Sequence, residues 1–433
     1  MKQPLKGTLC GNSTVAALKI TPQVKKYLSI LLLLISGQAM AQQIDRPNTI
    51  DLFEIESEFL KESRTIKVSL PYDYAKSTKS YPIILVLDNQ LMFSTMTAMV
   101  NQLSAVSRIP ESLVVTITEG TKHRTHYAPN LYSNSNERAY GYGNHQKEFT
   151  QFLQNELLPK LDANYRTVNF RTLVGFSPSS IFTLHTLLKS PDLFQAYIAI
   201  AAGNIIGDGY KKGESFIDII TNFSIKDALP NAYLYVVSGG GDLDNQPHIR
   251  ANVDGFNQNI STFSNDNFKA KAEIIDGEGH TDVLLPGIIS AMDFIFPKEK
   301  WFVDYVDLIN TSRNPKENID DFYNALSLEY GFTVYPNMDR LYSMSCIKNV
   351  GSRLLREDRF NEAIELYQYW TDLYPQSAKA HAYLGYAQKH AENFKASRVS
   401  YEKAVAIAKK ESNPQVITYQ KALDELKTST NRK

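Results

Sequence analysis

The segment from Arg171 to Leu188 constrains the fold more than any other part of the sequence. Residues 171–175 contain β-branched and apolar side chains and predict a strand, and residues 181–188 predict a helix. Between them, Gly175-Phe176-Ser177-Pro178 leaves room for only a sharp turn. A serine at such a turn lies at the carboxyl edge of a sheet, where open α/β sheets place their functional residues. The segment therefore predicts an α/β fold.

This strand, turn and helix match the nucleophile elbow of α/β-hydrolases, G-x-S-x-G, with Ser177 as the candidate nucleophile. The second glycine is replaced by Ser179, and the residue after the nucleophile is Pro178. The backbone N–H after the serine normally stabilises the oxyanion, and proline has no N–H. Loss of one such donor costs about 3 kcal/mol of transition-state stabilisation, so Pro178 puts activity at some risk. Pro178 also suits the first position of a helix, and both interpretations can hold together.

Further along the chain, an acid and a base follow in the order Ser, Asp, His that this fold requires. An apolar strand over residues 231–237 ends in a glycine-rich turn that carries Asp242 and Asp244. Another strand, over residues 270–275, is followed by a short loop that ends in His280. Three strand edges in the required order favour a catalytic triad over a polar turn and a solvated loop histidine. The pattern leaves both aspartates open as the acid.

Residues 56–296 resemble the putative esterase family of α/β-hydrolases, which includes esterase D and the enterochelin esterases. Besides the elbow, the resemblance rests on several short motifs, which are Ser57–Arg64, Leu70-Pro71, Tyr81–Gln90, Glu156–Pro159, Pro191–Phe194 and Gly277–His280. The resemblance implies an α/β-hydrolase fold with a mostly parallel central sheet. It also implies a serine esterase that cleaves a siderophore-like or other small ester through an acyl-enzyme.

The resemblance assigns the site residue by residue. Ser177 would be the nucleophile, His280 the general base and Asp244 the acid. The backbone of Asn89 or Gln90 would supply oxyanion donors, with the donor of Pro178 missing. No metal or other cofactor is implied. Because the elbow is altered, a second interpretation is a catalytically degraded hydrolase domain that acts as a binding protein with its helical repeats. A peptidase on the same fold is a third.

The N-terminus predicts export. Lys25-Lys26 precede an apolar run over residues 27–36 and the small-x-small sequence Ala39-Met-Ala41, the pattern of a signal peptide over residues 1–41. The apolar run is too short to span a bilayer. We therefore expect a periplasmic or secreted protein, cleaved after Ala41. Its 46 basic and 46 acidic residues give no net charge and no electrostatic footprint for nucleic acid, so the expected partner is a small-molecule ester.

The rest of the chain predicts an all-α region. After an esterase domain over residues 42–298, residues 299–343 predict a helical connector. Residues 344–411 repeat at an offset of 34, which is the period of tetratricopeptide repeats, and residues 412–433 predict a capping helix and tail. Gly351 recurs as Gly385 and Tyr367 as Tyr401. Two functions stay open for the two repeats: a groove for a protein or peptide partner, or a stabilising or dimerising appendage.

Overall fold

The structure, a computed structural model, describes residues 49–118, 129–133, 138–140, 143–226, 232–262, 267–339 and 345–430. The predicted signal peptide over residues 1–41 lies outside the described residues.

An eight-stranded sheet forms the centre of the fold, in the order β1-β2-β4-β3-β7-β8-β9-β10. Six adjacent strands, from β4 to β10, run parallel, and β2 is antiparallel to both of its neighbours. The predicted α/β-hydrolase fold with a mostly parallel sheet is confirmed. The strands are β1 (Ile50–Ser57), β2 (Glu62–Ser69), β3 (Tyr81–Val86), β4 (Leu113–Ile117), β7 (Thr167–Phe176), β8 (Ala196–Ile200), β9 (Ala232–Gly239) and β10 (Phe268–Ile275). A separate pair is formed by β5 (Leu131–Tyr132) and β6 (Arg138–Tyr140).

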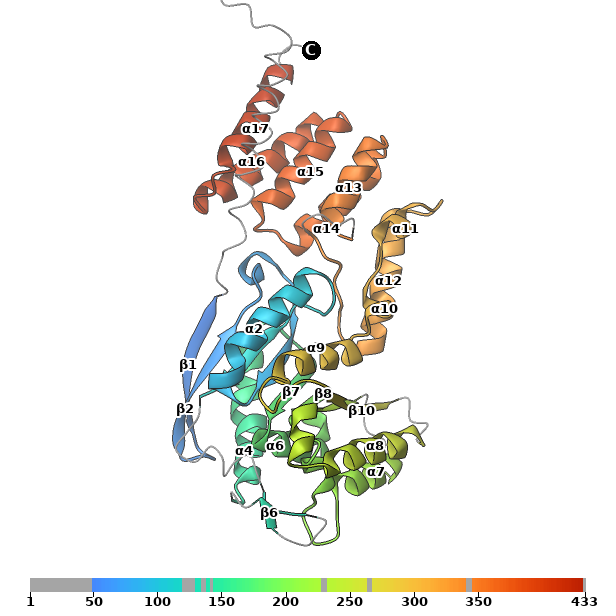
Figure 1. Cartoon of the computed structure of the whole chain (residues 1–433). Helices are drawn as coiled ribbons and strands as arrows, with labels where there is room; N and C mark the ends of the chain where they lie inside the picture. The colour runs from blue at the N-terminus through green and yellow to red at the C-terminus, as the bar shows by residue number, and fades with distance from the viewer. Residues whose placement is uncertain are drawn as a thin grey trace, which may run out of the picture. The chain divides into compact units, whose positions relative to one another are not determined.

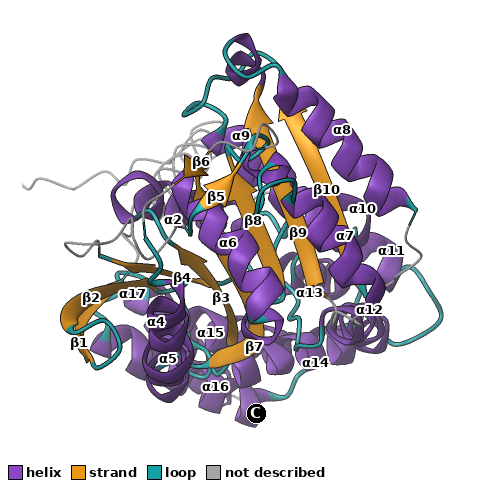
Figure 2. Ribbon diagram, turned by 90° about the horizontal axis from the view of Figure 1, so that it is seen from below, coloured by secondary structure: helices purple, strands orange, loops and turns teal. Residues whose placement is uncertain are grey.

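Helices bury both faces of the sheet, as a parallel sheet requires. Alternate residues of one strand enter different cores: Ile83 and Leu85 of β3 lie in one, Ile84 and Val86 in the other. The first core is covered by α4 (Gln146–Phe152), α5 (Leu158–Asn164), α6 (Pro178–Lys189), α7 (Phe216–Lys226) and α8 (His248–Ser261). Figure 2 shows α6, α7 and α8 in front of the strands. The second core is covered by α2 (Asn89–Ala105) and α9 (Leu284–Ile295).

After α9, the described residues form helices joined by loops, with no strand among them. The segment predicted as the connector contains α11 (Tyr305–Ile309) and α12 (Pro315–Tyr330), preceded by α10 (Lys298–Trp301). The segment predicted as repeats contains α13 (Ile347–Arg356), α14 (Phe360–Leu373), α15 (Ala378–His390) and α16 (Phe394–Lys410), and α17 (Val416–Thr430) follows. Figure 1 draws α13 to α17 as neighbouring helices, coloured orange to red. This all-helical region confirms the predicted fold class, whereas its assignment to the tetratricopeptide repeats stays a prediction.

Equivalent contacts recur 34 residues apart in this helical region. A Cβ added to Gly351 would lie 2.6 Å from the ring of Tyr367, and one added to Gly385 would lie 2.9 Å from the ring of Tyr401. Each glycine therefore lets a tyrosine of the following helix pack directly against the backbone. The second sheet core continues from α9 through α12 into α13 and α14, so the helical region shares buried apolar side chains with the α/β part.

Candidate active site

Ser177 lies at a strained turn between β7, which ends at Phe176, and α6, which begins at Pro178. Its backbone φ of 53° and ψ of −117° lie outside the regions that non-glycine residues favour, at a cost of about 1–3 kcal/mol. The Ser177 N–H donates to the carbonyl of Ile200 in β8, at 2.8 Å. A Cβ on Gly175 would lie 2.5 Å from the carbonyl oxygen of Ser179, so only glycine permits this close packing of strand and helix.

His280 brings its imidazole to the nucleophile. It follows β10 on a loop that turns at Gly277, whose φ of 84° favours glycine. Nε2 of His280 lies 3.1 Å from Oγ of Ser177, which is within hydrogen-bond distance. The ring of Phe176 packs edge-on against the imidazole, with centroids 5.4 Å apart. The serine and the histidine predicted from the sequence are therefore in contact.

Asp242 contacts the other ring nitrogen of His280. Both of its carboxylate oxygens lie 3.1 Å from Nδ1 of His280. The carboxylate is 17% exposed and the imidazole 47% exposed, so the acid lies deeper than the base. The end of strand β9 lies close to the histidine loop. A Cβ on Gly239 would lie 2.5 Å from the carbonyl oxygen of Glu278, so the close approach requires glycine at this position. The Gly241 N–H also donates to that carbonyl, at 2.9 Å.

The structure thus brings Asp242 to the imidazole of His280, and not Asp244, the acid implied by the family spacing. Both aspartates belong to a single 3₁₀ turn over residues 240–244. In a 3₁₀ helix successive side chains are about 120° apart, so residues at positions i and i+2 point in different directions. Asp244 is exposed at the end of this turn, whereas Asp242 is partly buried and contacts the imidazole.

Around the predicted oxyanion site, Pro178 is the first residue of α6 and contributes no N–H. Asn89 and Gln90, the other predicted donors, are the first two residues of α2 and directly follow Asp88, which lies two residues after the end of β3. The bond from Met92 N–H to the carbonyl of Asp88, at 2.8 Å, marks the first turn of α2. Backbone N–H groups before such a bond have no partner within the helix.

The sequence reasoning missed a carboxylate and a hydroxyl at the elbow. The backbone N–H of Phe176 lies 2.7 Å from Oγ of Ser179 and 3.1 Å from Oδ2 of Asp88. The hydroxyl of Ser179 donates to the same Oδ2. Ser179, which replaces the second glycine of the motif, is therefore hydrogen-bonded as well as small. The only sequence signal was the aspartate that ends an apolar strand.

The described parts of the chain contain neither a candidate metal site nor a candidate membrane-spanning helix. There, no group of three or more His, Cys, Asp and Glu side chains is arranged to hold a metal ion. Likewise, no helix among the described residues is long and apolar enough to cross a membrane.

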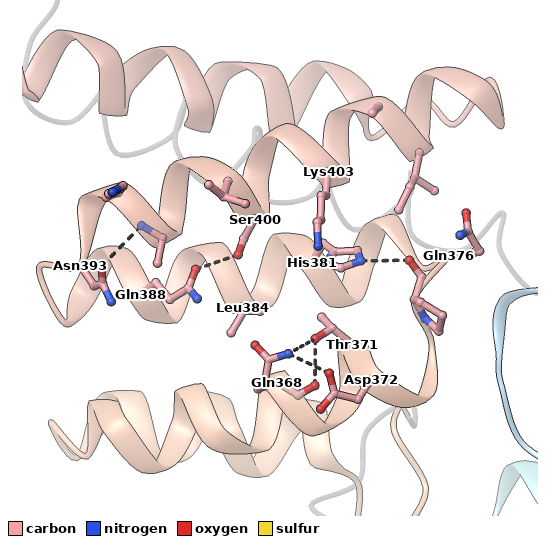
Figure 3. A pocket seen from close by; sticks show the side chains of 16 residues that line it. Gln368, Thr371, Asp372, Gln376, His381, Leu384, Gln388, Asn393, Ser400 and Lys403 are labelled. Atoms are coloured by element: carbon pink, nitrogen blue, oxygen red, sulfur yellow. Dashed lines mark hydrogen bonds between the residues drawn. The ribbon is translucent and has the colours of Figure 1, made fainter.

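A groove of about 1000 Å³ lies in the helical region, away from Ser177, between α14, α15 and α16 (Figure 3). Its walls carry polar side chains that bond to one another. The hydroxyl of Ser400 donates to the side-chain oxygen of Gln388 at 2.8 Å, and Nε2 of His381 lies 3.0 Å from the carbonyl of Pro375. Burial lowers the pKa of His381, so this imidazole stays neutral at neutral pH. The groove contains no arrangement of nucleophile and base.

The sequence of the α/β part is similar to those of known proteins. The sequence profile of the family described as Putative esterase matches residues 57–259. Ferri-bacillibactin esterase BesA of Bacillus subtilis (strain 168) is 27% identical over 232 residues, which are 48% of this chain and 76% of BesA.

Solved structures share the fold. An IroE-like serine hydrolase from Shewanella oneidensis has a TM-score of 0.60 at 21% identity, covering 74% of this chain and 100% of that protein. An uncharacterised protein from Capnocytophaga ochracea DSM 7271 has a TM-score of 0.50 at 15% identity, covering 88% of this chain and 100% of that one. At these identities the matches show a common fold alone.

Proposed function

The α/β part of this chain belongs to the putative esterase family, and on that premise we propose that Ser177, His280 and Asp242 carry out its hydrolysis of carboxylic esters. The protein is a serine hydrolase that acts on esters. The observation that carries the residue assignment is the 3.1 Å contact between His280 Nε2 and Ser177 Oγ at a strained elbow. Backbone strain at a nucleophile is the kind of outlier that supports a functional role.

The proposed reaction begins with proton transfer. Ser177 Oγ attacks the ester carbonyl carbon while its proton passes to Nε2 of His280. Nδ1–H of His280 donates to Asp242, which holds the imidazole in the required tautomer and stabilises the imidazolium. The tetrahedral intermediate then expels the alcohol, which takes the proton from Nε2. Water, activated by the same nitrogen, hydrolyses the acyl-enzyme.

The oxyanion would be stabilised by fewer donors than usual. We assign this role to the backbone N–H groups of Asn89 and Gln90 at the start of α2, because Pro178 has none. One oxyanion donor contributes about 3 kcal/mol to transition-state stabilisation. The missing donor is also the observation that favours the second candidate function, a degraded hydrolase domain that binds an ester or a partner without cleaving it.

The substrate proposed is a siderophore-like ester or another small ester. Support comes from the 27% identity to a protein named ferri-bacillibactin esterase over 76% of that protein's length. The roles of the N-terminal segment and of the repeats stay predictions: export to the periplasm or beyond, and binding of a protein or peptide partner.

Turnover assays separate the two candidate functions. The purified protein is offered p-nitrophenyl acetate and, separately, a ferric catecholate siderophore with an ester backbone. We expect turnover that Ser177→Ala abolishes and Ser180→Ala retains, because Ser180 lies on the same helix but donates only to backbone carbonyls. Binding of the ester without Ser177-dependent turnover would support the degraded hydrolase instead.

A further inference from the structure

Asp88 and Ser179 tie together the two chain segments on either side of the catalytic serine. Oδ2 of Asp88 accepts from the backbone N–H of Phe176 at 3.1 Å, and it also accepts from the hydroxyl of Ser179. Phe176 directly precedes Ser177, and Ser179 lies two residues after it. One carboxylate oxygen, 91 residues away in sequence from Ser179, therefore spans the nucleophile turn.

A third bond closes the arrangement. The N–H of Phe176 also reaches Oγ of Ser179, at 2.7 Å, and is thus shared between the hydroxyl and the carboxylate. Ser179 is 1% exposed, so these bonds form where water does not compete. Hydrogen bonds to an ionised group are roughly twice as strong as neutral ones. The three groups form a lock, defined here as Asp88, Phe176 N–H and Ser179.

The residues of the lock flank Ser177, the residue whose backbone is strained. Ser177 holds a positive φ of 53°, which persists only when the surrounding structure imposes it. A glycine at position 179, as in G-x-S-x-G, would fit the same space but could neither donate to Asp88 nor accept from Phe176. The replacement of that glycine thus adds two hydrogen bonds at the turn that aims Ser177 Oγ toward His280.

Because Asp88 takes part in the lock, its side chain does not cap the start of α2. Asp88 is the N-cap residue of α2, a position where an aspartate normally accepts from the N–H groups of the first turn. Here its side chain makes no capping bond to the helix. The carboxylate faces the elbow instead, and it leaves the first-turn N–H groups of α2 without that competitor. These N–H groups are the donors that we assign to the oxyanion, and Pro178 adds none to them.

We propose that Ser179 and Asp88 are positioning residues for ester hydrolysis: they fix Ser177 in its attacking geometry and keep the N-terminus of α2 uncapped for the oxyanion. This inference rests on the proposed function of Ser177. Both residues act through Ser177 and the start of α2, and we assign neither of them a contact with the substrate. A misplacement of about 1 Å at a reacting group can cost about 100-fold in rate.

The test compares two buried serines of one helix. Ser180 is as buried as Ser179, but its hydroxyl donates to the carbonyls of Gly175 and Ile200, at 3.0 and 2.8 Å, and to no carboxylate in the bonds described. Both Ser179→Ala and Ser180→Ala therefore remove buried hydrogen bonds and lower Tm. Only Ser179→Ala breaks the lock. Ser179→Gly is a second variant that fits the elbow without added atoms.

For p-nitrophenyl acetate, measured well below Tm, we expect Ser179→Ala and Ser179→Gly to lower kcat about 10- to 100-fold, with KM changed less than about 3-fold. Ser180→Ala should keep kcat within about 3-fold of the parent. Asp88→Asn, which keeps the shape but loses the charge, should lose less kcat than Asp88→Ala. In an Asp88→Ala/Ser179→Ala double variant the losses should not add, because groups that act as a unit are not additive.

The outcomes distinguish two kinds of failure. Parent protein without Ser177-dependent turnover would overturn the proposed function, and the positioning role with it. Parent turnover that Ser179→Ala and Ser179→Gly both retain, in folded protein, would overturn the lock alone. An equal loss of kcat in Ser179→Ala and Ser180→Ala would also overturn it, because the effect would then be one of general packing.

Discussion

Nδ1 of His280 lies 3.1 Å from each carboxylate oxygen of Asp242. An acceptor placed symmetrically on Nδ1–H favours one tautomer, in which Nε2 carries the lone pair that faces Ser177. The aspartate is less exposed than the imidazole, so the charge that fixes the tautomer is held away from bulk water. This pairing makes the choice of acid open to direct test.

Asp242→Asn should lower kcat far more than Asp244→Asn. Loss of the tautomer-fixing acid costs about 10⁴-fold in a serine-protease triad, and we expect a loss of about 10²- to 10⁴-fold here. Asp244→Asn, in the same turn and exposed, is the matched control and should stay within about 3-fold. The measurement is kcat for p-nitrophenyl acetate at saturation. A larger loss in Asp244→Asn would restore the acid that the family spacing implies.

Pro178→Ala should raise kcat. The variant restores an N–H directly after the nucleophile, and an oxyanion donor acts mainly on charge present in the transition state. We expect an increase of about 10- to 1000-fold with KM little changed. Pro315→Ala is the control, because Pro315 is likewise the first residue of a helix, α12, and lies outside the site. An unchanged kcat in folded Pro178→Ala would mean that this N–H does not reach the oxyanion.

Lys79→Met should destabilise the protein by about 2 kcal/mol. The Lys79 side chain is 4% exposed and is paired with Glu111, and its ammonium lies 4.9 Å from the ring centroid of Tyr374, just after α14. Burial opposes its charge, but Glu111, Tyr81 and Asp73 together outweigh burial and raise the pKa of Lys79 above its ordinary value. Breaking a fully buried pair costs about 3–5 kcal/mol, and we expect less because Glu111 is 35% exposed.

Lys76→Met is the control for Lys79. The Lys76 side chain is 26% exposed, and its ammonium lies 3.6 Å from Asp73 and 3.8 Å from Glu411. Exposed pairs of this kind contribute about 0–1 kcal/mol. Urea unfolding of the full chain gives the free energy of unfolding of each variant. Equal losses in the two variants would show that burial of Lys79 does not matter.

Asp208→Asn should stabilise the protein at pH 8 and not at pH 4. Burial raises the pKa of the Asp208 carboxyl from 3.8 to about 7. Between these values the unfolded chain ionises while the folded protein keeps the proton, so stability falls as pH rises and levels off above pH 7. A pKa difference of this size corresponds to roughly 4 kcal/mol in the free energy of unfolding at 1.36 kcal/mol per pKa unit. We expect Asp208→Asn to raise the free energy of unfolding at pH 8 by about half of that.

Thermal unfolding over that pH range measures the effect of Asp208→Asn. The difference in stability between variant and parent should be near zero at pH 4 and should grow up to about pH 7. A difference that does not change with pH would show that the Asp208 carboxyl titrates normally in the folded protein.

The sequence predicted those features that short segments determine. The elbow at Ser177 follows from one strand, one turn and one helix, and His280 follows from its place after a strand. Chain order then fixes how these edges meet, because parallel strands present their carboxyl ends on one side of the sheet. The fold class and the contact between serine and histidine were accessible in this way.

What the sequence did not predict depends on turn geometry and on distant pairs. The choice between Asp242 and Asp244 is made by a 3₁₀ turn that brings one of them to the imidazole. The bond between Asp88 and Ser179 joins residues 91 positions apart, and no local pattern encodes it. From the sequence, Ser179 could be judged only by its size.

Labelling with a fluorophosphonate probe tests the central claim most directly, because the probe reacts with serines that a neighbouring base activates. The full chain is treated with the probe, digested, and the adduct is mapped by mass spectrometry. We predict a single adduct on Ser177, absent in Ser177→Ala and strongly slowed in His280→Ala. An adduct on another serine, or equal labelling of the parent and Ser177→Ala, would contradict the account.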